Sequence, residues 1–365
     1  MKIPLIKPFL PDSVKERVLS VLESGFLTEG RVTAEFEAAC SDFLEVAHCL
    51  AMSSCTVGLE VILRYLGICP GDEVIVPDYT YPATADVVAI AGAKIIIVDV
   101  NPETMLIDYD ALEKAITPRT KAVIPVSLFG NPLDYERLTA IKKSSGIQVI
   151  EDAACAFGAL YREKKVGGLC DFSVFSLHPR KFITTGEGGL VTTSSKTGSE
   201  WMRSYKHFGM DPSVSRKNTV FRMIGTNYKM SDVLAAIGLG QMEYVETLLD
   251  RRRELAGYYL ELLAGAGQVA LPFTTMGGRH SYQTFCVFVE NRDQVLKTMR
   301  SHGIEVQIGT YCLHQQPAFQ PGDQCEIRGS LSGSVYAGDH CLALPMYHEL
   351  TRKDQETVIE RLVAS

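Results

Sequence analysis

The sequence lacks the features that mark membrane proteins, nucleic-acid-binding proteins and repeat proteins. No apolar run reaches the roughly 18 residues that a membrane-spanning helix needs. The formal net charge of −7 is spread along the chain without a basic cluster, so nucleic acid and acidic membrane surfaces are poor partners. No internal repeat or low-complexity segment is present. An anionic ligand would therefore need a local site rather than the field of the whole protein.

The ten cysteines form neither a CxxC pair nor a Cys/His spacing typical of a metal site, so we expect no bound metal. Scattered thiols in a long chain that is 46% hydrophobic are typical of a reducing compartment. The first eight residues, MKIPLIKP, contain prolines and lysines where a signal peptide needs an apolar run. We therefore expect a cytoplasmic protein.

Short Val/Ile-rich runs alternate with helix-like segments through the first two thirds of the chain. This alternation predicts an α/β fold with a mostly parallel central sheet flanked by helices. The expected strands cover residues 73–77, 94–100, 121–127, 148–152 and 171–177. The expected helices between them cover residues 108–116 and 133–144, and a further helix at 57–66 precedes the first strand.

The chain of 365 residues is longer than one hydrophobic core usually holds, so we expect two domains. Residues 241–263 predict one long helix with a charged face. A strand at 283–290 and helices near 292–302 and 351–364 follow it. We place the boundary near residue 240, with a large domain over 1–240 and a smaller α+β domain over 241–365.

Three polar residues follow the expected strands at positions that suit a cofactor. Asp152 ends one strand, Ser176 ends the next, and Lys181 follows before a glycine-rich turn at 186–189. In a parallel sheet these residues would share the carboxyl edge, where ligands bind. A pyridoxal phosphate site needs a carboxylate for the pyridine nitrogen, a hydroxyl for the phosphate, and a lysine that forms the imine and moves protons.

Each of these residues has an ordinary interpretation when it is taken alone. A single lysine is usually a solvated surface group, and an aspartate after a strand is commonly a helix cap or a turn residue. The segment 186–189 could be a plain hairpin turn. Arg180, beside Lys181, could lower the pKa of that amine, since a like charge disfavours the ammonium form. The hypothesis of a cofactor site therefore rests on the combination of these residues and not on any one of them.

Two further segments support a phosphate site and an aromatic contact. Residues 53–56 (SSCT) precede an expected helix, whose free N–H groups and dipole would attract a phosphate. An ordinary helix cap is the alternative. Residues 77–81 (PDYTY) follow a strand, and an aromatic side chain there could stack on a flat ring. A buried core tyrosine is the alternative.

Together these motifs resemble the DegT–DnrJ–StrS family of sugar aminotransferases, which have the fold type I architecture of aspartate aminotransferase. The resemblance covers nearly the whole chain. It rests on SGFLT at 24–28, PGDEVIVP at 70–77, EDAA at 151–154, the stretch 176–181 with TGEGG at 185–189, NYKM at 227–230 and LPMY at 344–347.

The resemblance implies pyridoxal 5′-phosphate as the cofactor and a homodimer with shared active sites. It implies that Lys181 is the Schiff-base lysine and that Asp152 pairs with the pyridine nitrogen. The other implied roles are phosphate binding by Cys55, Thr56 and Ser176, ring stacking by Tyr81, a contact from Asn227 to the phosphate of the partner subunit, and a sugar pocket near Tyr311 and His314.

Three residues depart from the family pattern at positions that the resemblance places in the site. Cys155 stands where the family usually has Gln or His beside the cofactor, and a thiol is a weak donor. Cys55 replaces a usual Gly, which is tolerable if only its N–H is used. Lys229 replaces Arg near the substrate, which keeps the charge but loses the bidentate fork.

The resemblance implies an aminotransferase that moves an amino group from L-glutamate to a keto sugar, usually a nucleotide-linked keto-deoxyhexose, in amino-sugar biosynthesis. A keto-cyclitol or a free keto-sugar acid is an alternative acceptor. The dehydratase branch of the family replaces the lysine with histidine, so Lys181 argues against that activity. A non-catalytic regulator that binds cofactor or sugar is the alternative from another class, and the intact Lys181, Asp152 and phosphate set disfavours it.

Overall fold

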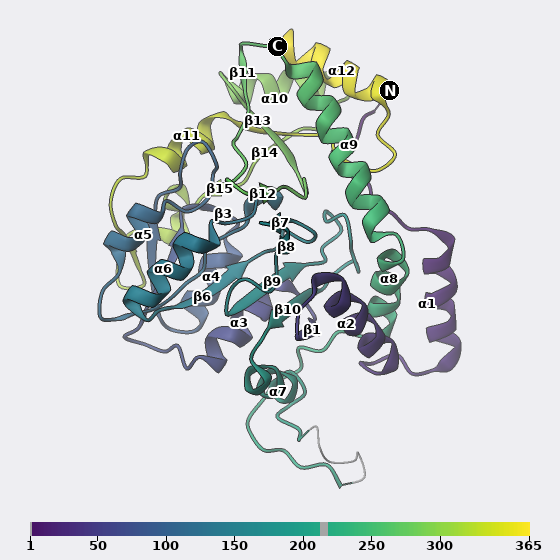
Figure 1. Cartoon of the computed structure of the whole chain (residues 1–365), viewed down its shortest axis with the longest axis vertical. Helices are drawn as coiled ribbons and strands as arrows, with labels where there is room; N and C mark the ends of the chain where they lie inside the picture. The colour runs from purple at the N-terminus through teal and green to yellow at the C-terminus, as the bar shows by residue number, and fades with distance from the viewer. Residues whose placement is uncertain (1, 212–217) are drawn as a thin grey trace.

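The computed structural model describes residues 2–211 and 218–365, and its centre is an eight-stranded sheet with helices on both faces (Figure 1). The strand order across this sheet is β1-β10-β9-β6-β5-β2-β4-β16. β10 runs antiparallel to both of its neighbours, and the other neighbouring strands pair in parallel. The strands are β1 (His48–Met52), β2 (Glu73–Pro77), β4 (Lys94–Val98), β5 (Thr120–Val123), β6 (Gln148–Asp152), β9 (Phe172–Ser176), β10 (Gly189–Thr193) and β16 (Cys325–Ile327).

The expected α/β fold with a mostly parallel sheet is confirmed. All five residues of β2 are buried, as near-continuous apolar runs in a parallel sheet require. The run expected at 121–127 forms a shorter strand, because β5 ends at Val123, two residues before Pro125. Proline has no N–H group with which to continue the ladder.

Helices cover the two faces of the large sheet and close two apolar cores. Four helices pack on one face: α2 (Arg31–Leu44), α5 (Tyr109–Ala115), α6 (Tyr135–Ser145) and α8 (Asp232–Met242), with α1 (Asp12–Ser24) against α8. Three helices pack on the other face: α3 (Cys55–Tyr65), α4 (Ala83–Ile90) and α7 (Lys196–Tyr205). No helix in the described ranges is long and apolar enough to cross a membrane.

A second, four-stranded sheet lies beyond the large one, beside the long helix α9 (Val245–Leu263) (Figure 1). Its strand order is β11-β13-β17-β14, and its apolar core is separate from the other two. Its elements are β11 (Val269–Ala270), β13 (Phe285–Val289), β14 (Gln307–Ile308), β17 (Cys341–Leu344), α10 (Arg292–Ser301) and α12 (Arg352–Val363).

The expectation of one helix over 241–263 is wrong at its start. Gln241 and Met242 end α8, and α9 begins at Val245 after Tyr244, whose backbone angles are not helical. The side chain of Gln241 is buried and bonds to the backbone of Thr184 in the large domain. This tertiary contact belongs to α8, so the charged face of the sequence pattern starts only with α9.

The chain returns to the large sheet after the second one has begun. β15 (Tyr311–Cys312) pairs with β3 (Tyr79–Thr80), and β16 joins the large sheet beside β4. The domain boundary near residue 240 stays a prediction, because the later segments contact both sheets. The remaining elements are α11 (Ser332–His340), β7 (Leu160–Tyr161), β8 (Lys164–Lys165), β12 (Gly278–Arg279), η1 (Leu128–Gly130), η3 (Leu313–Gln315) and η4 (Pro317–Phe319).

A buried ion pair links Glu73 at the start of β2 to Arg119, which precedes β5, and to Arg328, which follows β16. Glu73, which begins β2 and is 1% exposed, accepts two hydrogen bonds from Arg328, of 2.9 and 3.0 Å. Arg119 and Thr117 donate to the same carboxylate over 2.9 and 2.7 Å. Burial alone would raise the pKa of Glu73, but the bonds from Arg328, Thr117 and Arg119 outweigh it and lower the pKa to about 2.

Glu73→Gln should therefore lower the free energy of unfolding by about 2 kcal/mol at pH 7. A carboxyl group with a depressed pKa in the folded state stabilises above its unfolded pKa, and this contribution is lost as the pH falls toward 2. The difference between wild type and variant, measured by urea titration, should shrink below about pH 4.5. A difference that stays constant down to pH 3 would contradict this account. Glu136→Gln, which breaks an exposed pair with Arg162, is the control and should change little.

Candidate active site

The large sheet brings the expected lysine and aspartate to one edge. Asp152 is the last residue of β6 and pairs in register with Val174 of β9. The connection from β9 to β10 carries Lys181, whose ammonium donates to the Cys155 sulfur over 3.0 Å. Asp152 lies close enough to Lys181 to raise the pKa of its amine. Lys181, Asp152 and Cys155 therefore form one cluster.

The pKa of Lys181 shifts in the direction opposite to the one expected from Arg180. Burial alone would lower the pKa of this amine, but Cys155, Cys55 and Asp152 outweigh burial and raise it. Arg180 is exposed and donates to the side chain of Gln307 over 3.1 Å. The expectation that Arg180 lowers the pKa of Lys181 is therefore wrong, because Cys155 above all, with Cys55 and Asp152, raises it.

Asp152 is a buried carboxylate with few partners in its own chain. It is 5% exposed, and it accepts hydrogen bonds from the Thr84 hydroxyl over 2.8 Å and the Ala154 N–H over 3.1 Å. Burial raises the pKa of Asp152, although both bonds and the nearby Lys181 oppose this. Thr84, near the start of α4, was not identified from the sequence, and its hydroxyl also bonds to Thr80 over 3.0 Å.

The expected phosphate-binding residues meet where β10 passes the start of α3. Ser54 caps α3 by accepting from the Val57 N–H over 3.2 Å, and Cys55 and Thr56 begin the helix. The first N–H groups of an α-helix have no partner within the helix, so those of Cys55 and Thr56 can bind an anion. Burial raises the pKa of the Cys55 thiol well above its usual value, so the thiol is neutral.

Gly189 makes this arrangement possible. It pairs with Met52 of β1 on one side and with Ser176 of β9 on the other. A Cβ atom on Gly189 would lie 2.5 Å from the Cys55 nitrogen and 2.6 Å from the Ser54 carbonyl carbon. The backbone of the 53–56 loop therefore packs directly on Gly189, which places it beside Ser176.

The residues expected near the ring and the sugar form a rim around the short β3–β15 pair. Tyr81 is 64% exposed, and its ring centroid lies 6.3 Å from that of Tyr311. His314 donates its backbone N–H to Asp78 over 2.8 Å, and its Nδ1 lies 2.6 Å from the other carboxylate oxygen. Asp78, which the sequence did not single out, is fully buried and fixes the orientation of the His314 ring.

Asn227 and Lys229 lie together, and in the described ranges neither forms a hydrogen bond with Lys181, Asp152 or Cys155 of its own chain. Asn227 forms an isolated bridge with His207, and Lys229 donates to the Asn227 side chain over 2.5 Å. Tyr228, between them, accepts a hydrogen bond from the Ser53 N–H over 2.9 Å. The segment therefore lies beside the 53–56 loop.

The cluster fits a cofactor that carries both a cationic ring nitrogen and a phosphate. The buried Asp152 carboxylate is short of positive partners, and the start of α3 offers N–H groups to an anion. A lysine amine lies within the same cluster. Pyridoxal phosphate needs this combination of groups.

The model of the DegT/DnrJ/EryC1/StrS aminotransferase family matches residues 10–363. The chain belongs to this family. It is 37% identical over 370 residues to a GDP-perosamine synthase of Caulobacter vibrioides, covering 99% of this chain and 97% of the relative. It is 31% identical over 376 residues to a UDP-4-amino-4-deoxy-L-arabinose–oxoglutarate aminotransferase of Shewanella sediminis, covering 98% and 96%.

The fold is also that of solved aminotransferase structures. Spr1654 of Streptococcus pneumoniae, solved in a PLP-form, superimposes with a TM-score of 0.92 at 27% identity, covering 100% of this chain and 98% of that chain. The resemblance stated from the motifs is confirmed, and this aminotransferase depends on pyridoxal phosphate. The roles of single residues are proposals, set out below.

Gly189→Ala tests the packing of the phosphate loop in this aminotransferase. The added methyl group would meet backbone atoms of Ser54 and Cys55, so the loop must shift. Overpacking of this kind costs about 1–3 kcal/mol, so the affinity for pyridoxal phosphate should fall by about fivefold to about a hundredfold. Titration of the apoenzyme with pyridoxal phosphate, followed by absorbance, measures this affinity. Gly257→Ala, in the open middle of α9, is the control and should leave affinity unchanged. An affinity within twofold of wild type for Gly189→Ala would refute the close packing.

Proposed function

We propose that this aminotransferase transfers an amino group from L-glutamate to a nucleotide-linked keto sugar, with Lys181 as the residue that holds the cofactor. The assignment of Lys181 rests on the position of its amine. The Lys181 Nζ lies 3.0 Å from the Cys155 Sγ, and it is close enough to the buried Asp152 for that carboxyl group to raise its pKa. Both relatives described above are named for nucleotide-linked amino sugars, which supports the class of acceptor.

The chain's own residues would bind the cofactor and move protons around it. Pyridoxal phosphate, when bound, supplies a carrier for the amino group and a sink for electrons. Asp152 would pair with the pyridine nitrogen and keep it protonated, and Thr84 would hold that carboxylate in place. Lys181 would accept and return the proton that moves at the reacting carbon.

The phosphate and the ring would be held by residues on either side of the lysine. Cys55 and Thr56 would bind the phosphate through their N–H groups and the Thr56 hydroxyl, together with the Ser176 hydroxyl. Tyr81, at the exposed rim, would cover the ring. Cys155 would lie beside the cofactor, where its sulfur already contacts Lys181.

The acceptor would enter between the aromatic rim and the segment of Asn227. Tyr311 and His314 would contact the sugar, and the Asp78 carboxylate would orient the His314 ring from behind. Lys229 would attract the anionic nucleotide as a point charge. A keto-cyclitol and a free keto-sugar acid are the alternative acceptors. Turnover with glutamate would exclude a non-catalytic regulator.

We also infer a cytoplasmic homodimer in which each subunit completes its partner's site. Asn227 makes its described contacts with His207 and Lys229 rather than with Ser176, which leaves the Asn227 amide for a phosphate outside its own chain's pocket. Exposed apolar side chains lie near this segment and would be covered in a dimer: Phe208, Val220, Phe221 and Ile224.

Borohydride reduction of the loaded enzyme, followed by peptide mapping, should place the label on Lys181. Lys181→Ala should abolish turnover with glutamate and a nucleotide-linked keto sugar while the protein stays folded, because Lys181 is the amine that bonds to Cys155 in the cluster. Lys164→Ala, in the exposed β8, is the control and should keep both label and turnover. Label on Lys164 or Lys165 would contradict the assignment.

Mixing two inactive variants tests the shared site. Lys181→Ala and Asn227→Asp subunits should form mixed dimers in which one site carries both lesions and the other carries neither. Random pairing makes about half of the dimers mixed, so activity should return to about a quarter of wild type. Lys181→Ala mixed with Ser176→Ala is the control and should restore nothing, since both residues belong to one chain's site. No recovery in the first mixture, with subunit exchange verified, would mean that Asn227 does not act across the interface.

A further inference from the structure

The connection that carries Lys181 has little regular structure of its own. It runs from Leu177 to Gly188, between β9 and β10, without a helix or a strand. The Lys181 N–H donates to the His178 carbonyl over 2.8 Å, and the Thr185 N–H donates to the Leu177 carbonyl over 3.0 Å. The peptide groups between these two anchors need other partners if the lysine is to hold one position.

One buried side chain supplies partners on both sides of the lysine. The Gln283 amide oxygen accepts from the Phe182 N–H over 3.1 Å, and its amide nitrogen donates to the Arg180 carbonyl over 2.7 Å. Gln283 is 5% exposed. A glutamine can donate and accept at once, so it pairs with the two peptide groups that flank Lys181 as a neighbouring strand would.

A second buried glutamine, Gln241, holds the same connection at Thr184, three residues after Lys181. Gln241 of α8, fully buried, accepts from the Thr184 N–H over 3.1 Å and donates to the Thr184 carbonyl. Gln241 thus fixes the end of the segment, whereas Gln283 fixes the peptide groups on either side of the reactive amine. Of the two glutamines, Gln283 is therefore the one that bears directly on the position of Lys181.

Gln283 is itself held in a strained and tightly packed segment. Arg252 of α9 donates to the carbonyls of Gln283 and Tyr282 over 3.1 and 2.9 Å. Tyr282 has a positive φ of 51°, which is unusual for a bulky residue and is tolerated where the surroundings enforce it. Gly130 has a φ of 100°, and a Cβ atom there would lie 3.1 Å from the Gln283 nitrogen and 2.4 Å from the Ser281 hydroxyl.

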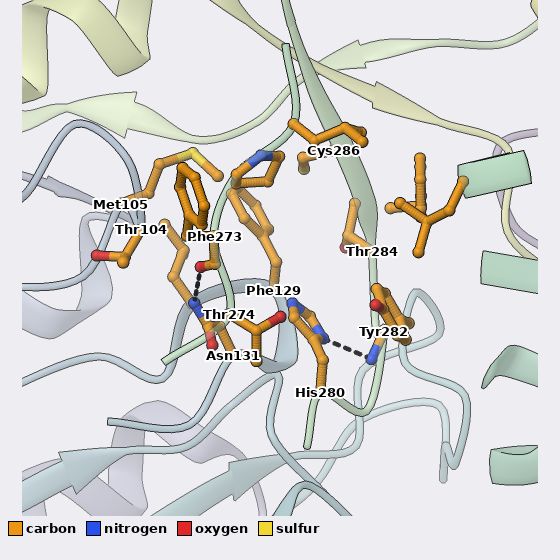
Figure 2. Close-up of a pocket in the computed structure, with 15 residues that line it drawn as sticks. Thr104, Met105, Phe129, Asn131, Phe273, Thr274, His280, Tyr282, Thr284 and Cys286 are labelled. Atoms are coloured by element: carbon orange, nitrogen blue, oxygen red, sulfur yellow. Dashed lines mark hydrogen bonds between the residues drawn. The ribbon is translucent and has the colours of Figure 1, made fainter. Parts of the chain in front are cut away.

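Figure 2 shows the other side of this segment, where His280, Tyr282 and Thr284 line a cavity of about 40 Å³ together with Phe129 and Asn131. The Tyr282 N–H donates to the His280 ring over 2.8 Å, and the two rings stack with centroids 4.3 Å apart. The segment is therefore anchored through its backbone and its aromatic side chains, which lets Gln283 act as a fixed support.

The same segment also reaches Cys155. The Ser281 hydroxyl donates to the Cys155 carbonyl over 3.3 Å, and the Cys155 sulfur contacts the Lys181 amine. Ser281 and Gln283 therefore hold the backbones of both partners in the contact between sulfur and amine. They do so from the segment that leads into β13, on the second sheet.

We propose that Gln283 is a positioning residue for Lys181: it fixes the two peptide groups around the lysine and so sets where the amine stands. The inference rests on the proposed role of Lys181. Because a displacement of about 1 Å can cost about a hundredfold in rate, a support that fixes both flanking peptides controls reactivity without touching the cofactor.

Gln283→Leu, which has similar volume and no hydrogen-bonding groups, tests the proposal. The rate of covalent attachment of pyridoxal phosphate to Lys181 and the kcat should each fall at least about tenfold, with the KM for glutamate within about threefold. Gln355→Leu is the matched control: Gln355 is a fully buried glutamine of α12 that bonds to the Leu255 carbonyl over 2.8 Å. It should lower the thermal midpoint and leave both rates within about twofold.

Gln283→Glu gives a second measurement that does not depend on the leucine variant folding. A carboxylate can accept from the Phe182 N–H but cannot donate to the Arg180 carbonyl, whereas a neutral carboxyl group can do both. Burial raises the pKa of such a group, whereas the neighbouring Arg252 guanidinium and Lys181 amine lower it, so the carboxylate should gain a proton only as the pH falls. The attachment rate of Gln283→Glu, divided by that of wild type, should therefore rise as the pH is lowered from 8 to 6.

The outcomes separate this inference from the function on which it rests. If wild type forms no adduct at Lys181, the role of Lys181 fails. If wild type forms the adduct and Gln283→Glu follows it at every pH, only the role of Gln283 is overturned. Equal losses of attachment rate in Gln283→Leu and Gln355→Leu would also overturn it, since the effect would then be general destabilisation.

Discussion

The burial of the Asp152 carboxyl group is the constraint on which the rest of the site depends. The parallel sheet ends β6 inside the protein, so this carboxylate is 5% exposed and cannot be hydrated fully. Thr84 and Ala154 each give it one hydrogen bond, and the Lys181 amine is its nearby cation. An isolated buried carboxylate is costly, so the edge that holds Asp152 suits a ligand that brings a positive charge. The lysine, the phosphate loop and the aromatic rim are all arranged around that edge.

The sequence predicted those parts of the site that follow from the order of strands. Asp152 and Ser176 end neighbouring buried strands, and the parallel pairing that brings them together is readable from apolar runs. Gln283 and Thr84 could not be found in this way, because they lie 101 and 68 residues from the groups that they hold. A single glutamine or threonine carries no periodic signal. The direction of the Lys181 pKa shift was also missed, since Arg180 is adjacent in sequence but turned toward Gln307.

The carboxyl groups at the two edges of the large sheet are paired to different extents. At the amino edge Glu73 is paired with Arg328 and Arg119, so its charge is satisfied and adds to stability. At the carboxyl edge Asp152 has one hydroxyl and one N–H partner, with the Lys181 amine nearby. Proteins commonly depart from local optimisation at functional sites and compensate elsewhere. The same sheet thus holds a stabilising ion pair at one edge and a less completely paired carboxyl group at the other.

Arg252 is another buried charged group, and it lies where the two sheets meet. Its guanidinium is 3% exposed, and its hydrogen bonds in the described ranges go to carbonyl oxygens of Tyr282, Gln283 and Met346. Burial lowers the pKa of Arg252 to about 9, so the group is still charged at neutral pH. Its guanidinium carbon also lies 5.2 Å from the ring centroid of Phe182, the residue after Lys181. A buried cation without a carboxylate is weak support for stability, since an apolar side chain would avoid its desolvation. Arg252 does join α9, the approach to β13 and the end of β17 behind the lysine segment. Its geometry therefore serves to orient these elements, which is what the placement of Lys181 requires.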